Sequence, residues 1–367
     1  MNVITHIINR SVLWLFFLAA MTVNAFSQDK QSDVEQDSIR KHNIDFKKKL
    51  QAEKSYNEGV KAFEEGRLDE ALGHLDQALN TYSDFQEALF NRASVRMEKS
   101  DFEGANTDLS RLLSLNNSHA QGYYLRGKAS IGLAKFEQAK KDLARSISLD
   151  PSNGKCHYKL GYVNFETGNF EEAIGNYSEA IKLNPNFAYA YNDRGSAKRA
   201  LEQYKEAIQD YSAAIVLDKQ MAIAYNNRGS CNRKLKQYNA AIQDYTKAIT
   251  AKPDYTIAFN NRGSAKFELG DFEGALMDYT LAINYNSKYS YAYNNRGYTN
   301  HKLGKYTEAI KDFNKAIEID ESYGYAFLNR GITKEMLRDA SACDDWRRAA
   351  DLGIKNGRIY SDQDCAD

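Results

Sequence analysis

A short segment built around an arginine and a glycine returns at a constant interval along the chain. It reads YNNRG at 225–229 and 293–297, and related forms stand at 191–195 (YNDRG), 259–263 (FNNRG) and 327–331 (FLNRG). The guanidinium of arginine binds carboxylates through parallel hydrogen bonds, and the amide of asparagine offers two donors and an acceptor. Both are groups that recognise and position others, so the question is whether they serve a ligand or the fold.

The chain lacks the sequence patterns of common catalytic and metal-binding sites. It contains no HExxH, no glycine-rich phosphate loop and no Gly-x-Ser-x-Gly segment. The histidines share no spacing that suits metal ligands, and the acidic residues follow the repeat instead of forming catalytic pairs. We therefore predict no metal, no cofactor and no enzyme activity. The histidines are His6, His42, His74, His119, His157 and His301.

An aspartate follows the recurrent arginine at a constant spacing. Both are absent from two repeats, where Glu58 with His74 and Leu160 with Asn176 take their places. In the last repeat the two stand one place closer together, because the turn between them is shorter by one. An arginine on a buried helix face needs a partner, so this joint occurrence predicts salt bridges within the repeats. The alternative is a ladder of arginines that faces a ligand. The predicted pairs are Arg92–Asp108, Arg126–Asp142, Arg194–Asp210, Arg228–Asp244, Arg262–Asp278, Arg296–Asp312 and Arg330–Asp345.

The repeat resolves into two helices when the recurrent glycine is numbered position 8. Positions 3, 4, 7, 8, 10 and 14 form one inward stripe at helical spacing, and positions 20, 24, 27 and 28 form a second. Small residues at positions 8 and 20 allow the two helices to approach closely. All three prolines fall at position 32, where they end the unit. The units begin at residues 52, 86, 120, 154, 188, 222, 256, 290 and 324.

This pattern resembles the tetratricopeptide repeat (TPR) family. The resemblance rests on an aromatic residue at position 4, Gly at 8, Leu at 14, Ala at 20, Tyr or Phe at 24, Ala at 27 and Pro at 32. The interval between successive units also equals the length typical of that family, about 34 residues. The resemblance covers residues 52–356 and implies an all-α, right-handed superhelical solenoid of about nine helix-turn-helix repeats. It also implies that helix A, the first helix of each unit, lines the concave surface.

The outward stripe of helix A supplies the candidate partner-binding residues. Asparagine recurs at positions 5 and 6, and a row of amides at repeat spacing can hold the backbone of an extended peptide. Position 2 adds apolar area, and two arginines at position 12 add a positive spot that suits carboxylates. The alternatives are a solvated helix face for the asparagines and ordinary surface charge for the arginines. The candidates are Asn91, Asn192, Asp193, Asn226, Asn227, Asn260, Asn261, Asn294, Asn295, Asn329, Tyr189, Tyr291, Tyr325, Arg199 and Arg233.

The segments at the two ends lie outside the repeats. Residues 1–27 hold an apolar run followed by small residues that suit signal-peptidase cleavage, which predicts a signal peptide, with an uncleaved membrane anchor as the alternative. Residues 28–51 are polar and are predicted to be a linker or a frayed helix. Cys343 and Cys365 either pair in a disulfide that staples a capping tail, 357–367, over the end of the solenoid or remain free thiols.

The charge balance narrows the class of partner. The 49 acidic and 49 basic residues cancel, which argues against nucleic acid. We expect no membrane span in the mature chain and a monomer or weak oligomer. The sequence thus predicts an exported scaffold, periplasmic or secreted and of Gram-negative type, that binds a protein or extended peptide in its concave groove. The alternatives are a regulatory or assembly subunit of an enzyme or envelope complex, and an architectural solenoid that acts through its convex face.

Overall fold

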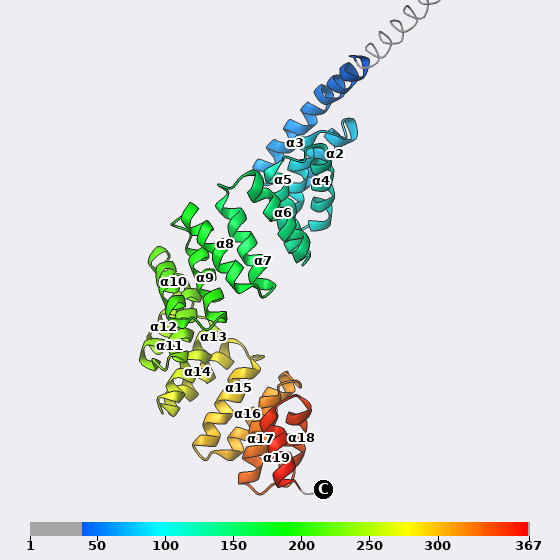
Figure 1. The fold of residues 1–367 in the computed structure, drawn as a ribbon. Coiled ribbons are helices and arrows are strands. Elements are labelled where there is room, and N and C mark those ends of the chain that lie inside the picture. Colours follow the sequence, from blue (N-terminus) through cyan, green and yellow to red (C-terminus); the bar gives the residue numbers. More distant parts are fainter. Residues whose placement is uncertain (1–38, 366–367) are drawn as a thin grey trace, which may run out of the picture. The chain divides into compact units, whose positions relative to one another are not determined.

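The computed structural model describes residues 39–365, which form helices joined by short turns (Figure 1). The described residues contain no strand, so the all-α prediction is confirmed. The predicted signal peptide, 1–27, and the first part of the predicted linker, 28–38, lie outside the described residues. Residues 39–51 are helical and continue without a break into residues 52–64, with most of their side chains exposed. None of the described helices combines the length and the apolar character that crossing a membrane requires.

The described helices alternate as helix A and helix B of successive helix-turn-helix repeats, and they divide into two compact units at residue 151. The first unit contains residues 39–64 as its first helix A, then α2 (Leu68–Thr81), α3 (Gln86–Glu98), α4 (Phe102–Leu115), α5 (Ala120–Gly132) and α6 (Phe136–Leu149). The second contains α7 (Gly154–Glu166), α8 (Phe170–Leu183), α9 (Ala188–Ala200), α10 (Tyr204–Leu217), α11 (Ala222–Lys234), α12 (Tyr238–Ala251), α13 (Thr256–Glu268), α14 (Phe272–Tyr285), α15 (Ser290–Lys302), α16 (Tyr306–Ile319), α17 (Gly324–Met336), α18 (Ala342–Asp351) and α19 (Lys355–Asp364).

A residue in the left-handed conformation ends helix A at position 15 of every repeat. In the fifth repeat this residue is Glu202, with φ 59°, and the N–H of Gln203 donates to the carbonyl of Lys198 at 2.9 Å. This hydrogen bond satisfies a backbone carbonyl that would otherwise have no partner at the end of the helix. Gly270 takes the same place in the seventh repeat, where glycine adopts the conformation without strain. The left-handed residue thus ends each helix A at the same position of the repeat.

The two helices of a repeat pack closely because small residues on both helices leave room for a large side chain on helix B. In the seventh repeat the small residue of helix B, Ala275, is fully buried. A Cβ atom on Gly263 would come within 2.8 Å of the Tyr279 ring, which is closer than real Cβ contacts. The glycine therefore makes room for the aromatic ring, and the two helices can approach closely.

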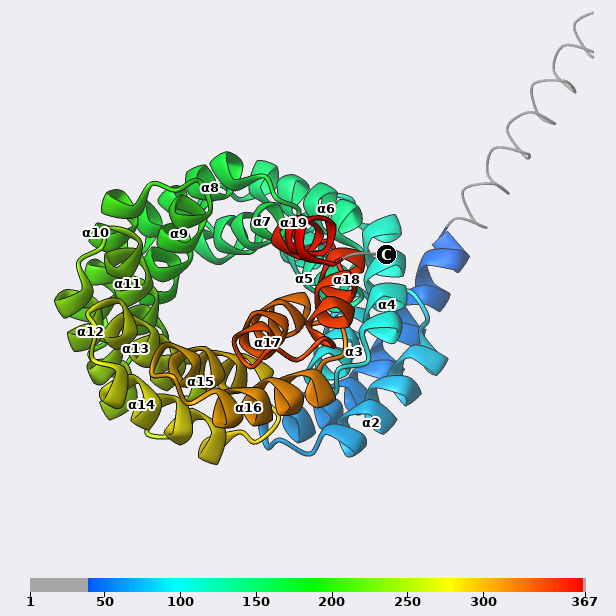
Figure 2. The same cartoon turned by 90° about the horizontal axis from the view of Figure 1, so that it is seen from below.

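The A helices lie on the inner side of the curve within the second unit. Successive A helices contact one another, as α9 contacts α11 and α11 contacts α13, whereas among the described helices each B helix packs mainly between its own A helix and the next. In Figure 2 the B helices α10, α12, α14 and α16 lie outside α9, α11, α13 and α15. The surface that the A helices share is therefore the inner surface, which is the one that the sequence assigns to a partner.

The C-terminal end of the second unit is closed by α19. The structure joins Cys343 on α18 to Cys365, which follows α19, and their Cα atoms lie 5.7 Å apart. The ring of Trp346 contacts the ring of Tyr360 with their centroids 5.3 Å apart. The last repeat would otherwise leave the apolar face of its helix pair open to water, so α19 takes the place of a further helix A.

Replacing both cysteines, as in Cys343→Ser/Cys365→Ser, should loosen this cap. The disulfide joins residues 22 apart, and removing such a cross-link typically costs about 2–4 kcal/mol. Hydrogen exchange measured by mass spectrometry should become faster in α18 and α19 and stay unchanged in α9 to α12. A reductant should produce the same effect in the native chain and no further effect in the double variant. Unchanged exchange in α19 of the double variant would contradict the stapling role.

Candidate functional site

Each arginine at position 7 lies against the aspartate of its own helix B. The Nη2–Oδ1 distances are 2.5–2.7 Å, and the aspartate side chains are 2–9% exposed. Nε of the same guanidinium also donates to the aspartate, as Arg262 does to Asp278 at 3.0 Å, so the pair is bidentate. The structure forms all seven predicted pairs: Arg92–Asp108, Arg126–Asp142, Arg194–Asp210, Arg228–Asp244, Arg262–Asp278, Arg296–Asp312 and Arg330–Asp345.

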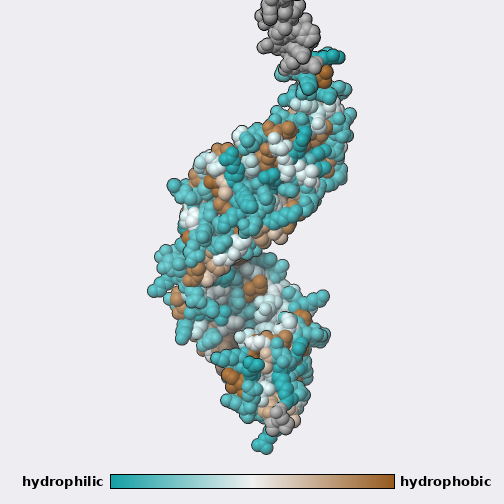
Figure 3. All heavy atoms as spheres, turned by 45° about the vertical axis from the view of Figure 1, so that its right-hand side comes forward, coloured by the Kyte–Doolittle hydropathy of each residue, from teal (hydrophilic) through white to brown (hydrophobic). Residues whose placement is uncertain are grey.

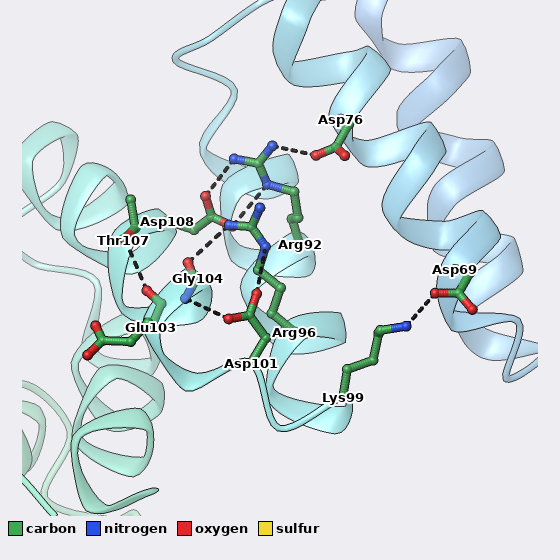
Figure 4. Close-up of polar contacts among 10 residues, drawn as sticks. All are labelled: Asp69, Asp76, Arg92, Arg96, Lys99, Asp101, Glu103, Gly104, Thr107 and Asp108. Atoms are coloured by element: carbon green, nitrogen blue, oxygen red, sulfur yellow. Dashed lines mark hydrogen bonds and ion pairs between the residues drawn. The ribbon is translucent and has the colours of Figure 1, made fainter. Parts of the chain in front are cut away.

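The same guanidinium also binds the repeat that precedes it. Nη1 of Arg262 donates to Oγ1 of Thr246 on α12, at position 25 of the sixth repeat. The equivalent acceptors are Asp76, Ser110, Ser178, Ser212, Thr280 and Asn314. Figure 4 shows Arg92 between Asp108 and Asp76. Each arginine thus connects three helices, and the geometry commits it to the fold and not to a ligand.

A second donor from helix A completes the shell of most of these aspartates. It comes from position 11, one helical turn after the arginine, as in Lys266, whose Nζ lies 2.9 Å from Asp278. In Figure 4 this donor is Arg96, which reaches Asp108 at 2.8 Å. A carboxylate that is almost fully buried is stable as an ion only when it is surrounded by donors in this way. The equivalent donors are Lys198, Asn232, Asn300 and Lys334.

The asparagines form ties between neighbouring repeats, which corrects the prediction that their amides are free for a partner. Nδ2 at position 6 donates to Oδ1 at position 5 of the preceding repeat, at 2.9–3.3 Å. The position-5 residues are only 3–7% exposed, because successive A helices cover them. The tied pairs are Asn192–Asn227, Asn226–Asn261, Asn260–Asn295 and Asn294–Asn329.

Two further repeats form the tie with a tyrosine at position 5. In the first unit Nδ2 of Asn91 donates to the hydroxyl of Tyr56 at 2.9 Å. In the second unit the hydroxyl of Tyr158 donates to a carboxylate, Asp193, at 2.6 Å. Burial raises the pKa of Asp193 above its usual value, although the hydrogen bonds from Tyr158 and Asn192 act in the opposite direction. The predicted binding residues Asn91 and Asp193 therefore also belong to the ties.

The inner surface of the second unit is hollowed by two adjoining cavities. One of about 440 Å³ lies over α7, α9 and α11, and its lining includes Tyr158, Tyr162 and Asp193. The other, of about 520 Å³, extends over α9, α11 and α13. Arg199, Ile223 and Asn227 line both cavities. The two cavities together are called the α7–α13 groove below, and the tied amides form part of its floor.

Apolar side chains follow the N-terminal ends of the A helices beside this groove. Position 2 contributes Tyr189, Ile223, Ile257, Tyr291 and Tyr325, which are 45–57% exposed. The ring of Tyr291 contacts those of Tyr289 and Tyr323, with centroids 5.6 and 4.9 Å apart. Figure 3 shows one face of the molecule as mostly hydrophilic, with hydrophobic residues in small scattered groups. Exposed apolar side chains repeated along one surface are typical of interaction sites.

Sequence reasoning missed the partners that hold the site together. The acceptors at position 25, the donors at position 11 and Tyr158 were not among the candidates. The acceptors at position 25 could have been found from their spacing. Thr246 precedes Arg262 by the same number of residues as Arg262 precedes Asp278, and the other repeats with an arginine follow the same rule, except that the aspartate of the last repeat stands one place closer. Position 5 of one repeat likewise stands at a constant spacing from position 6 of the next. Position 5 is tyrosine in the first, third and fourth repeats, and of these only the third has the arginine.

Asp193→Asn should stabilise the chain near neutral pH. A carboxyl with a raised folded-state pKa contributes stability below its unfolded pKa of about 4, and loses it as the pH rises through the folded pKa. At pH 7 the variant should therefore be more stable by about 0.5–2 kcal/mol, and the difference should vanish near pH 4. The variant can keep its contact with Tyr158, because Asn91 forms the equivalent tie with Tyr56.

Urea unfolding at several pH values measures this difference. Asp254→Asn, which removes an exposed carboxylate from a turn of the same unit, is the control and should change stability little at any pH. A gain from Asp193→Asn that is the same at pH 4 and pH 7 would contradict the assignment to ionisation.

The repeat also matches known sequence families. Profiles described as Tetratricopeptide repeat match residues 56–120, 120–153, 222–255 and 290–323, and a profile described as TPR repeat matches 163–198, 195–231 and 263–304. No curated protein matches the chain.

Several solved structures share the fold. A tetratricopeptide repeat protein from Parabacteroides merdae is 18% identical, with a TM-score of 0.57, over 67% of this chain and 98% of that one. The structure of the APC/C hetero-tetramer Cut9–Hcn1 is 15% identical, with a TM-score of 0.55, over 81% of this chain and 59% of that one. YrrB, described as a TPR protein with an unusual peptide-binding site, is 23% identical over 50% of this chain and 95% of its own, with a TM-score of 0.45. With matches from residue 56 to residue 323, the chain belongs to the tetratricopeptide repeat family, whose members serve as protein-interaction scaffolds.

Proposed function

We propose that the chain is an exported, non-enzymatic scaffold that binds an extended segment of a partner protein along the α7–α13 groove. The observation that carries the proposal is the pair of adjoining cavities on the inner surface, bordered by exposed apolar side chains of the A helices. A groove that spans four successive A helices suits an extended peptide better than a compact small molecule.

The intramolecular ties prepare this surface before a partner arrives. In α9, α11 and α13 the arginine pairs set the position of the helix against two B helices, and the ties between A helices set the distance from one A helix to the next. A groove whose walls are already in place loses little conformational entropy on binding, so more of the contact energy contributes to affinity. On this account the amides act on affinity indirectly, by holding the groove in shape.

Export is the second part of the proposal. The apolar run within residues 1–27 has the length and flanks of a signal peptide. The disulfide between Cys343 and Cys365 independently favours an oxidising compartment, since such bonds rarely persist in the cytosol. A regulatory or assembly role for an enzyme on another chain would use the same groove, and it is the second candidate function.

Substituting the apolar border of the groove should abolish partner capture. Ile223→Ser/Ile257→Ser alters two side chains that are each 45% exposed, so the fold should lose little stability. The matched control is Val216→Ser/Met277→Ser, on the B helices α10 and α14, where the side chains are 75% and 67% exposed. Affinity capture from an envelope extract of the source cells, quantified by mass spectrometry, compares the two variants with the native chain.

We expect the control variant to retain the proteins captured by the native chain and the groove variant to lose them by tenfold or more, about 1.4 kcal/mol. Equal capture by all three chains, with matching melting curves, would count against the groove. Selective loss in the control variant would move the binding site to the B-helix surface.

A further inference from the structure

Two arginines in the α7–α13 groove differ from those at position 7. Arg199 on α9 and Arg233 on α11 stand at position 12 of consecutive repeats and line the groove. Among the described residues no carboxylate lies within 4.0 Å of either guanidinium, whereas Arg194 and Arg228 on the same helices have aspartates at 2.6 Å. One arginine on each helix is therefore neutralised by an aspartate, whereas the other has no carboxylate of the fold beside it.

The part of the groove over α9–α13 is positively charged. Three cationic residues, Arg199, Arg233 and Lys234, line this cavity of about 520 Å³, and its lining contains no aspartate or glutamate. Nε of Arg233 is buried and has no hydrogen-bond partner. A buried donor on a charged group is costly when it is unpaired, so the fold does not use the full hydrogen-bonding capacity of this arginine.

The groups beside these arginines are neutral. Burial raises the pKa of Tyr211 and of Tyr245, and the nearby Arg199 and Arg233 offset this only in part. Both phenols therefore stay protonated near neutral pH and cannot balance the guanidinium charges. Each hydroxyl is engaged with a serine of helix A, as Tyr245 is with Ser230 at 3.3 Å, and the Tyr245 hydroxyl also interacts with the side chain of Arg233.

Acidic residues mark one border of the positive region. Glu166 and Asp193 line the adjoining cavity over α7 and α9, and Asp193 is already bonded by Tyr158 and Asn192. A negatively charged ligand group is thus repelled from that end and attracted between α9 and α13. The exposed side chains of Ile223 and Ile257 border this place and can contact the apolar neighbours of such a group.

We propose that Arg199 and Arg233 bind a carboxylate of the partner segment, which rests on the proposed use of the groove for an extended peptide. Arginine suits this role because its planar guanidinium donates two parallel hydrogen bonds to one carboxylate. The carboxylate comes from an aspartate or glutamate side chain or from the C-terminus of the partner.

Synthetic decapeptide libraries test the proposal on the purified full-length chain. One library ends in C-terminal amides and the other in free carboxylates. Enrichment of Asp or Glu among binders from the amidated library assigns the group to a side chain. Binders found only in the free-acid library, without internal acidic residues, assign it to the C-terminus. Either pattern supports the proposal, and the dissociation constant of the best peptide is then measured by fluorescence anisotropy.

Arg199→Gln/Arg233→Gln should weaken that peptide roughly tenfold to a hundredfold, and replacing the peptide carboxylate by its amide should have no further effect on the variant. The matched control, Lys205→Gln/Lys219→Gln, removes the same charge from exposed positions outside the groove and should change affinity by less than about twofold.

The proposal is overturned if the selected peptides need Ile223 and Ile257 but show no carboxylate preference, a result that leaves the proposed function standing. It is also overturned if the lysine control weakens binding as much as the arginine variant does. Peptides that bind equally well to Ile223→Ser/Ile257→Ser would count against the proposed groove itself.

Discussion

The bidentate contact between the arginine at position 7 and the aspartate at position 23 is the interaction on which the rest of the structure depends. At Arg262 it joins α13 to α14 through Asp278, and the remaining nitrogen, Nη1, donates to Thr246 on α12. Asp278 is 1% exposed and has lost nearly all contact with water, so its charge is stable only while the donors stay in place. One side chain thus fixes both the angle within a repeat and the contact between repeats.

The groove follows from this constraint. With α9, α11 and α13 held by their arginines, the asparagines at positions 5 and 6 meet the next helix A and tie to it, as Asn261 ties to Asn226 at 3.0 Å. The amides that the sequence presents as binding groups are thereby occupied by the fold. Other groups along the inner surface include the apolar side chains at position 2 and the two arginines at position 12. The two arginines interrupt the repeat pattern, because no other repeat has arginine at position 12.

The sequence predicted the repeat, its two helices and the arginine pairs because copies of the unit can be compared within one chain. Arginine and aspartate disappear together in the fourth repeat, where Leu160 and Asn176 replace them. The third repeat correspondingly has Ala144 at position 25, which offers no side-chain acceptor. The sequence placed the asparagines on the inner surface, where several of them line the groove, but it did not reveal that they bond to one another across neighbouring repeats. Tyr158 and Asp193, which stand at the same spacing as each tied asparagine pair, would have indicated the tie. The sequence indicated a positive spot at Arg199 and Arg233, but it could not show that their cavity is lined by no carboxylate, because that depends on which residues of three successive A helices meet in space.

The central claim is that two arginines on one helix have opposite roles. Arg228 holds α11 to its neighbours, whereas Arg233, further along the same helix, lines the groove and is the residue proposed to bind a ligand. Urea unfolding of Arg228→Gln and Arg233→Gln, followed by circular dichroism, compares them directly. We predict that Arg228→Gln lowers the free energy of unfolding by roughly 3–5 kcal/mol, because it leaves Asp244 buried without its partner. Arg233→Gln should leave it unchanged or slightly higher. A comparable loss of stability in both variants would contradict the account.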